Sequence, residues 1–207
     1  MNFPSEINYY LLTFAMVLSY LLGSVSFGII IARFMNLGNL RSIGSGNIGA
    51  TNVLRTGSKT AAALTVILDG GKGYLVIYTT ISIFEQTYIP FTGIAVFLGH
   101  IFPIYYKFKG GKGVATFLGI ILATNVVVGI TVCGTWLVLA ILSKKSSVAA
   151  LGCSLVAPFF LFTNKPDEKV LFSIMLAVLI WWLHKENINR LMSGTEPSIK
   201  LKKNVNQ

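Results

Sequence analysis

Seven apolar runs alternate with polar segments along the chain. Runs of this kind predict membrane-spanning helices, although the fourth is shorter than the roughly 20 residues that a straight crossing needs. We therefore expect an all-α integral membrane protein that forms a single domain over residues 1–207. In chain order the runs are Tyr10–Phe34, Thr60–Phe84, Tyr88–Tyr106, Val114–Thr124, Val126–Leu142, Val148–Phe162 and Val170–Leu183.

Lysine and arginine residues are divided unevenly between the two sides that seven crossings define. Fourteen of the seventeen cations fall on one side, and such an excess marks the cytoplasmic side. If Val114–Thr124 did not cross, Lys144, Lys145 and the basic tail would move to the opposite side, against this rule. The pattern predicts a seven-transmembrane-helix bundle in which one of the seven spans is short. The N-terminus is expected outside and the C-terminus in the cytoplasm. The fourteen cations are Arg33, Arg41, Arg55, Lys59, Lys107, Lys109, Lys112, Lys144, Lys145, Lys185, Arg190, Lys200, Lys202 and Lys203.

The composition supports a membrane location and narrows the range of partners. Hydrophobic residues make up 54 % of the chain and charged residues 12 %, whereas a soluble domain carries about 25 % charged residues. The net charge is +10, and the basic residues lie between apolar runs rather than on one amphipathic face. We therefore expect membrane lipids and an anionic substrate as partners, and no nucleic acid. No cluster of His, Cys or Asp has metal-ligand spacing, and we expect neither a metal nor another cofactor.

A glycine-rich polar segment, Gly44–Asn52, follows the first apolar run. Its glycines free the backbone for close approach to a ligand. The short side chains of Ser45, Asn47 and Thr51 can form hydrogen bonds without bulk. Such a loop, flanked by arginines, can bind an anion. Ordinary turns between helices also collect Gly, Asn and Ser, so this segment alone supports both interpretations equally.

A second glycine-rich segment, Lys109–Thr116, leads directly into the short apolar run. Free N–H groups at the start of that helix, its dipole and the ammonium of Lys112 would favour a phosphate. The nucleotide-binding pattern G-x-x-x-x-G-K-[ST] is not met, because Gly113 follows Lys112, so ATP is not implied. The alternative is a cytoplasmic loop with flexible glycines, and the helix start favours the anion site.

A third polar segment, His184–Leu191, follows the last apolar run. On a helix, His184, Asn187 and Leu191 share a face. A histidine and an amide at the membrane boundary could therefore hold hydroxyl groups. The alternative is an interfacial histidine that ends a span, which is the commoner role of a lone histidine.

Three further polar residues lie within apolar runs. Asp69 and Lys72 are three residues apart, so they are neighbours on a helix and can pair. Ionic groups within a membrane face the protein interior. We interpret this pair as a structural ion pair near the site rather than as catalytic groups, and we interpret His100 as structural.

The three polar segments together resemble the bacterial acyl-phosphate:glycerol-3-phosphate acyltransferases. The shared motifs are G-S-G-N-x-G-A-T-N at Gly44–Asn52, K-G-G-K-G-V-A-T at Lys109–Thr116, and H-x-x-N-I-x-R-L at His184–Leu191. Each motif is weak alone, but three in this order between apolar runs are specific. The resemblance covers essentially the whole chain.

The resemblance implies transfer of a fatty acyl group from acyl-phosphate to the 1-hydroxyl of sn-glycerol 3-phosphate, which gives lysophosphatidic acid. It implies a multi-pass protein of the bacterial inner membrane with a cytoplasmic active site and an acyl chain in a lipid-facing groove between spans. The residues implied to bind glycerol 3-phosphate are Ser45, Arg55, Lys112, Ser147, His184 and Asn187. Those implied to bind the acyl-phosphate head group are Asn47, Thr51, the backbone of Gly110 and Gly111, and the side chain of Thr116.

The chain departs from the family pattern at two places. Leu183 stands where family members often carry a basic residue, just before the histidine. Gly70 and Gly71 stand between Asp69 and Lys72, where the family usually has bulky apolar residues. Two glycines in a helix interior would loosen or kink it, at roughly 1 kcal/mol each. Neither departure removes a residue of the implied site.

Transfer to a hydroxyl requires a proton acceptor, and His184 is one candidate base. The H-x-x-x-x-D dyad of other glycerolipid acyltransferases is absent, because Tyr105 follows His100 at +5 and Asn189 follows His184 at +5. We therefore favour a mechanism in which the substrate phosphate takes the proton. On this hypothesis Lys112 neutralises charge and His184 orients glycerol 3-phosphate.

Two other classes of function use the same cations differently. An organic-phosphate transporter or channel would need polar residues along a path through the bilayer, and the spans offer few beyond Asp69 and Lys72. A membrane scaffold without catalytic function would have no use for two glycine-rich phosphate sites on one face. Both alternatives are weaker than the acyltransferase.

Overall fold

The computed structural model describes residues 8–84, 86–164 and 168–199, and all regular structure in these ranges is helical. Four cations of the charge count, Lys165, Lys200, Lys202 and Lys203, lie outside the described residues. The α-helices of the described part are α1 (Tyr9–Gly23), α2 (Phe27–Phe34), α3 (Ala50–Leu54), α4 (Lys59–Ile83), α5 (Ile89–Ile101), α6 (Val114–Thr124), α7 (Val126–Ser143), α8 (Ser146–Asn164), α9 (Glu168–Leu183) and α10 (Lys185–Met192). Short 3₁₀ turns occupy Leu40–Ser42, Gln86–Tyr88 and Ile104–Tyr106.

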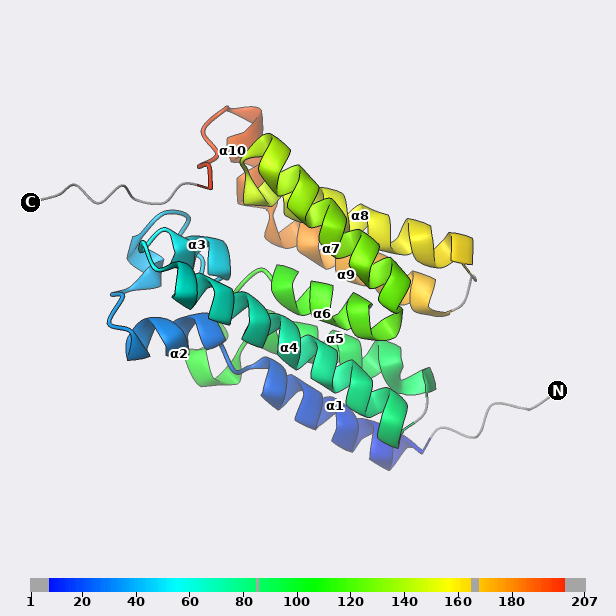
Figure 1. Cartoon of the computed structure of the whole chain (residues 1–207). Coiled ribbons are helices and arrows are strands. Elements are labelled where there is room, and N and C mark those ends of the chain that lie inside the picture. Colours follow the sequence, from blue (N-terminus) through cyan, green and yellow to red (C-terminus); the bar gives the residue numbers. More distant parts are fainter. Residues whose placement is uncertain (1–7, 85, 165–167, 200–207) are drawn as a thin grey trace, which may run out of the picture.

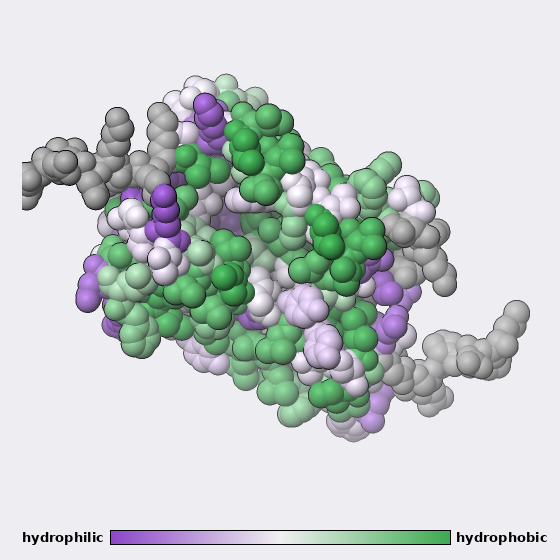
Figure 2. All heavy atoms as spheres, in the orientation of Figure 1, coloured by the Kyte–Doolittle hydropathy of each residue, from purple (hydrophilic) through white to green (hydrophobic). Residues whose placement is uncertain are grey.

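The described part confirms an all-helical, multi-pass membrane fold. Five segments of the described part are long and apolar enough to cross a membrane. Helices α9 and α10, which meet at 59°, form a sixth if they are counted as one broken span. The outer surface is apolar over most of the face in Figure 2, as lipid contact requires. Helix α6 has only 11 residues, so the expected seventh crossing stays a prediction, as does the orientation of the termini. The five clear spans are Tyr9–Phe34, Lys59–Ile83, Gln86–Tyr106, Val126–Ser143 and Ser146–Thr163.

Helix α6 lies between two groups of helices (Figure 1). Helices α1, α4 and α5 pack together on one side of it, and α7, α8 and α9 on the other. Phe97 of α5, Phe117 of α6 and Phe172 of α9 are fully buried in the same apolar core. The short helix is therefore enclosed by protein, which suits a segment that is too short to cross the bilayer as a straight helix.

The first apolar run is broken in the middle, a feature that its hydropathy did not predict. Helix α1 ends at Gly23 and α2 begins at Phe27. The carbonyl of Val25, within the break, accepts a hydrogen bond of 2.7 Å from Nζ of Lys72 on α4. A backbone carbonyl at membrane depth needs such a partner, because lipid offers none.

Helices α4 and α6 approach each other at backbone contact, and glycines permit it. Helix α4 continues through Gly70 and Gly71 as one 25-residue helix. A Cβ atom added to Gly119 of α6 would lie 1.9 Å from the carbonyl oxygen of Gly70. A Cβ atom added to Gly70 itself would lie 3.3 Å from the carbonyl oxygen of Ala115, whereas Gly71 has no atom within 4 Å of its Cβ position. The first of the two unusual glycines thus lies against α6, and the second faces open space.

We predict opposite effects of alanine at Gly119 and at Gly71. Gly119→Ala should lower the free energy of unfolding by about 1–3 kcal/mol, because the helices must move apart to admit the methyl group. Gly71→Ala should raise it by about 0.5–1 kcal/mol, because alanine is the better helix former and its methyl group meets open space. Thermal unfolding of both variants in detergent measures this. An unchanged Gly119→Ala midpoint would contradict the close packing.

Candidate active site

A cavity of about 150 Å³ opens where the three polar segments of the sequence meet, and we call it the central cavity. Its walls come from the loop before α3, from α4, α6, α7 and α8, and from α10 with the chain that follows it. The cavity brings together residues from all four parts of the chain that the resemblance implicated. Its sequence-predicted lining residues are Ser45, Asn47, Thr51, Arg55, Lys112, Ser147, His184 and Asn187.

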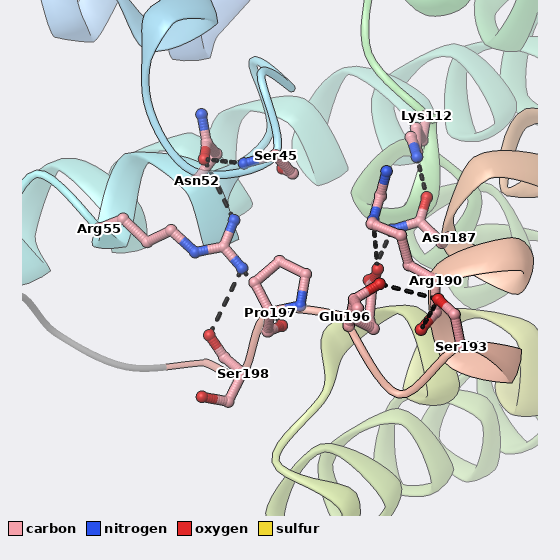
Figure 3. A network of polar contacts seen from close by, with 11 residues as sticks. Ser45, Asn52, Arg55, Lys112, Asn187, Arg190, Ser193, Glu196, Pro197 and Ser198 are labelled. Carbon is pink, nitrogen blue, oxygen red and sulfur yellow. Dashed lines mark hydrogen bonds and ion pairs between the residues drawn. The ribbon is translucent and has the colours of Figure 1, made fainter.

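The glycine loop before α3 is held in shape by Asn52, whose side chain is 2 % exposed. Its Nδ2 donates to the carbonyls of Leu40 and Asn47, each at 2.7 Å. Its Oδ1 accepts from the backbone N–H of Ser45 and from Nη1 of Arg55, each at 3.2 Å. One buried amide thus fixes the positions of Ser45 and Arg55 at the cavity (Figure 3).

Gly110, Gly111 and Thr116 lie behind the cavity wall rather than on it. The N–H groups of Gly110 and Gly111 donate to the carbonyls of Ile101 and His100, at 3.0 and 3.1 Å. These carbonyls are available because the last turn of a helix has no partners of its own. Thr116 is fully buried, and its hydroxyl donates to the Asp69 carbonyl at 3.0 Å. The two glycine N–H groups are therefore committed to the protein backbone.

The first turn of α6 offers the free donors on this side of the cavity. Gly113 has φ +76, and a Cβ atom there would lie 2.3 Å from the ring of Phe97, so the chain turns into α6 where only glycine fits. The helix has no side-chain cap. Its first amides have no partner within the helix. Gly113, Val114 and Ala115 line the cavity. The start of α6 is thus an anion-binding geometry.

A chain of polar contacts links Lys112 to the segment after α10 (Figure 3). Nζ of Lys112 donates to Oδ1 of Asn187. Nδ2 of Asn187 donates to Oε1 of Glu196 at 2.6 Å, and Nε of Arg190 donates to Oε2 at 2.8 Å. Burial lowers the pKa of Lys112, and the positive charge of Arg190 lowers it further. A dianionic phosphate beside this ammonium would offset both effects.

Glu196 was not among the predicted site residues, yet it lines the cavity and is 7 % exposed. Burial favours the neutral acid, but hydrogen bonds from Asn187 and Arg190 outweigh it and hold the Glu196 pKa below its ordinary value. The chain reaches this position by folding back over α10, where the N–H groups of Thr195 and Glu196 both donate to the Arg190 carbonyl. One feature of the sequence could have pointed to Glu196: it is an acidic residue in a basic tail, and the chain has only seven acidic residues.

The ring of His184 is fixed in one tautomer by its backbone contact. Its Nδ1 lies 2.7 Å from the carbonyl oxygen of Ile180, which can only accept, so Nδ1 carries the proton. Nε2 is then the acceptor on the neutral ring. Burial lowers the pKa of His184 to about 4, so the ring stays neutral near pH 7. His184 lines the cavity and can accept a hydrogen bond from a ligand hydroxyl.

We predict that Glu196→Gln weakens the site without removing a ligand-binding group. Loss of the carboxylate charge frees Arg190 and loosens the Asn187 amide that holds Lys112. Activity should fall about tenfold, mostly as a higher KM for the phosphate-bearing acceptor, since charge-assisted hydrogen bonds are lost. Steady-state kinetics in detergent measures the effect. Glu168→Gln is the control, because Glu168 is exposed at the start of α9, whereas the cavity adjoins the other end of that helix. Equal kinetics for both variants would show that Glu196 does not hold Asn187 and Arg190 in the positions that the site needs.

One wall of the cavity is apolar and leads toward the lipid-facing surface. Val66 of α4, Leu118 of α6 and Trp136 of α7 line it. Val66 is 46 % exposed on the outer surface. The site therefore combines a charged end with an apolar side, which suits an amphiphilic ligand. No group of three His, Cys, Asp or Glu residues in the described ranges could hold a metal ion.

Comparison with known proteins gives one consistent result. The family model described as "Glycerol-3-phosphate acyltransferase" matches residues 13–194. The chain is 50 % identical to the glycerol-3-phosphate acyltransferase of Dinoroseobacter shibae over 89 % of its length and 91 % of the relative's. It is 47 % identical to that of Caulobacter vibrioides over 96 % and 93 %.

Two similar crystal structures are of PlsY, an integral membrane glycerol 3-phosphate acyltransferase. The glycerol 3-phosphate form superposes with a TM-score of 0.86 at 37 % identity, over 90 % of this chain and 94 % of that one. The lysophosphatidic acid form superposes with a TM-score of 0.83 at 36 % identity and the same coverage.

Proposed function

Because the chain belongs to the glycerol-3-phosphate acyltransferase family, we propose that it transfers a fatty acyl group from acyl-phosphate to the 1-hydroxyl of sn-glycerol 3-phosphate. The products are lysophosphatidic acid and phosphate. The observation that carries this proposal is the central cavity, where Arg55 and Lys112 meet polar side chains of the third segment beside an apolar wall. Both substrates carry a phosphate, and the donor also carries a long apolar chain.

Glycerol 3-phosphate binds between the glycine loop and α10. Arg55 and Lys112 neutralise its phosphate, and Ser45 and Ser147, which also line the cavity, are neutral hydrogen-bonding groups. Asn187 holds the Lys112 ammonium in place. Nε2 of His184 accepts a hydrogen bond from a glycerol hydroxyl, which the tautomer set by Ile180 supports. This arrangement orients the acceptor rather than activating it.

Acyl-phosphate binds at the start of α6, with Asn47 and Thr51 on the facing loop. The amides of the first turn of α6 and the positive end of its dipole hold the phosphate. Gly110, Gly111 and Thr116 contribute by fixing the backbone behind this turn, since their own donors are already used. The acyl chain lies along Val66, Leu118 and Trp136 toward the lipid.

The reaction is a single displacement at the acyl carbon. The 1-hydroxyl oxygen forms a bond to the carbonyl carbon, the bond from that carbon to the phosphate oxygen breaks, and phosphate leaves. The hydroxyl proton passes to a substrate phosphate oxygen. Lys112 lies where it can neutralise charge on both phosphates, so it serves alignment and electrostatic stabilisation. A histidine with a pKa of about 4 is a poor general base near pH 7.

The site faces the cytoplasm in this proposal, and the protein lies in the bacterial inner membrane with seven spans. The charge count supports this orientation, since Arg55, Lys112 and Arg190 are among the cations of the basic side. Helix α6 is the enclosed seventh crossing, and the N-terminus is outside.

The test is turnover by purified, lipid-reconstituted protein supplied with acyl-phosphate and labelled glycerol 3-phosphate. We expect labelled lysophosphatidic acid that depends on both substrates and needs no added metal, acyl-CoA or acyl carrier protein. Product from acyl-CoA but not from acyl-phosphate would overturn the proposed donor. Absence of any product in folded protein would overturn the function.

A further inference from the structure

A buried ionic cluster lies inside the helix bundle and has no part in the chemistry proposed above. Asp69 and Lys72 of α4 and His100 of α5 are 2 %, 3 % and 3 % exposed. Nζ of Lys72 lies 2.9 Å from Oδ1 of Asp69 and 2.9 Å from Nδ1 of His100. Charged groups within a membrane protein are expensive to bury. A cluster of this kind therefore calls for a functional explanation.

The contact with Lys72 fixes how the ring of His100 presents itself. An ammonium has only N–H donors, so Nδ1 of His100 accepts and the neutral ring carries its proton on Nε2. Nε2 faces the second glycine segment, because a Cβ atom added to Gly111 would lie 2.4 Å from it. The ring therefore packs directly on the backbone of the loop, at a distance that only glycine allows.

The cluster also holds the segment from Gly110 to Thr116 at both ends. At one end the carbonyls of Ile101 and His100 accept from the N–H groups of Gly110 and Gly111. At the other end the carbonyl of Asp69 accepts from the Thr116 hydroxyl. Lys112 and the free amides of α6 lie between these two attachments. Asp69 and His100 themselves reach the cavity lining.

We propose that Asp69, Lys72 and His100 form a positioning unit for the donor phosphate. Lys72 and Asp69 set the ring of His100, and His100 holds the loop so that the first amides of α6 point into the central cavity. The inference rests on the proposed function, because it assigns the α6 side of the cavity to acyl-phosphate. The three residues act through the loop rather than on glycerol 3-phosphate.

A positioning role and a merely structural role predict different results. A structural ion pair that only joins α4 to α5 would, when weakened, lower stability and affect both substrates alike. A positioning unit would, when weakened, affect the donor selectively. Thr80 of α4 and Thr92 of α5 provide an internal control, since their hydroxyls lie 2.9 Å apart in the same helix pair about two turns away.

His100→Asn separates the two roles. The asparagine amide oxygen can accept from Lys72 near the position of Nδ1, but the side chain is too short to pack on Gly111. We expect near-normal thermal stability, a KM for acyl-phosphate raised about tenfold, and a KM for glycerol 3-phosphate within twofold of wild type. Thr92→Val should lower stability and leave both KM values within twofold.

A second variant removes the charges as a pair, so that no ion is left buried alone. Asp69→Asn combined with Lys72→Gln should fold, because the glutamine amide is neutral and can still donate to the Val25 carbonyl. It should show the same selective rise in the KM for acyl-phosphate. A His100→Asn enzyme whose KM for acyl-phosphate stays within twofold of wild type, or whose two KM values rise equally, would overturn the inference. A neutral double variant with wild-type kinetics would do the same.

A binding measurement keeps this inference distinguishable from the proposed function. Wild-type turnover tests the function, whereas the rise in melting temperature caused by acyl-phosphate tests the site without turnover. We expect this rise in the wild type and in Thr92→Val, and a smaller rise in His100→Asn at the same acyl-phosphate concentration. Stabilisation by acyl-phosphate without turnover would overturn the function alone. A wild type that acyl-phosphate does not stabilise, or equal stabilisation of His100→Asn, would overturn the positioning unit.

Discussion

Lys112→Ala is expected to lower kcat/KM by about 10²–10³-fold, which is the typical loss when one preorganised donor is removed from a transition state. The half-buried Lys112 ammonium donates to Asn187 at the start of α6. It lies between the two proposed phosphate positions, so its loss leaves both phosphates less neutralised. Activity should fall in kcat as well as in KM, because charge moves onto the leaving phosphate as the reaction proceeds.

Lys109→Ala is the matched control for this variant. Lys109 belongs to the same loop and carries the same charge, but its side chain is exposed. We expect kinetics within about threefold of wild type, as for a surface cation screened by salt. If both variants lost activity equally, the general charge of the loop would matter rather than the position of Lys112. Near-normal activity of Lys112→Ala would overturn the phosphate site.

His184→Ala should raise the KM for glycerol 3-phosphate about tenfold or more and change kcat much less. Its Nε2 is an acceptor for a substrate hydroxyl, and loss of one hydrogen bond that orients the substrate weakens ground-state and transition-state binding together. The KM for acyl-phosphate should stay near wild type. A large loss of kcat with an unchanged KM would indicate that His184 is the general base.

The pH dependence gives a second test of the same role. The His184 pKa of about 4 leaves the ring neutral above pH 5, whereas the dianion of a substrate phosphate takes up a proton at about pH 6. Activity should therefore fall as the pH drops through about 6, and His184→Gln should keep this inflection. The folded pKa lies below the unfolded value of about 6.5, so stability also falls between pH 6.5 and 4. Circular dichroism at each pH separates unfolding from inhibition.

The sequence predicted the helical membrane fold and the grouping of site residues for different reasons. Hydropathy was sufficient for the five clear spans, because each of these runs is apolar regardless of its neighbours. The grouping of Ser45, Lys112, Ser147 and His184 around one cavity needed the family motifs, because charge and topology place segments on one side of the membrane without bringing them into contact.

The features that sequence reasoning missed depend on tertiary contacts. The break between α1 and α2 lies within a continuous apolar run, and the bond from Lys72 that satisfies it comes from another helix. The amides of Gly110 and Gly111 seemed free for a ligand, but the last carbonyls of α5 accept from them. Glu196 follows the last motif and reaches the site only because the chain folds back over α10.

The break at Val25 also bears on how the protein is made. The first span leaves the ribosome before α4, so the Val25 carbonyl enters the membrane without the Lys72 ammonium that it contacts in the folded protein. The Val25 carbonyl is therefore satisfied only once the second span packs against the first, so pairing of these two spans completes the hydrogen bonding of the first.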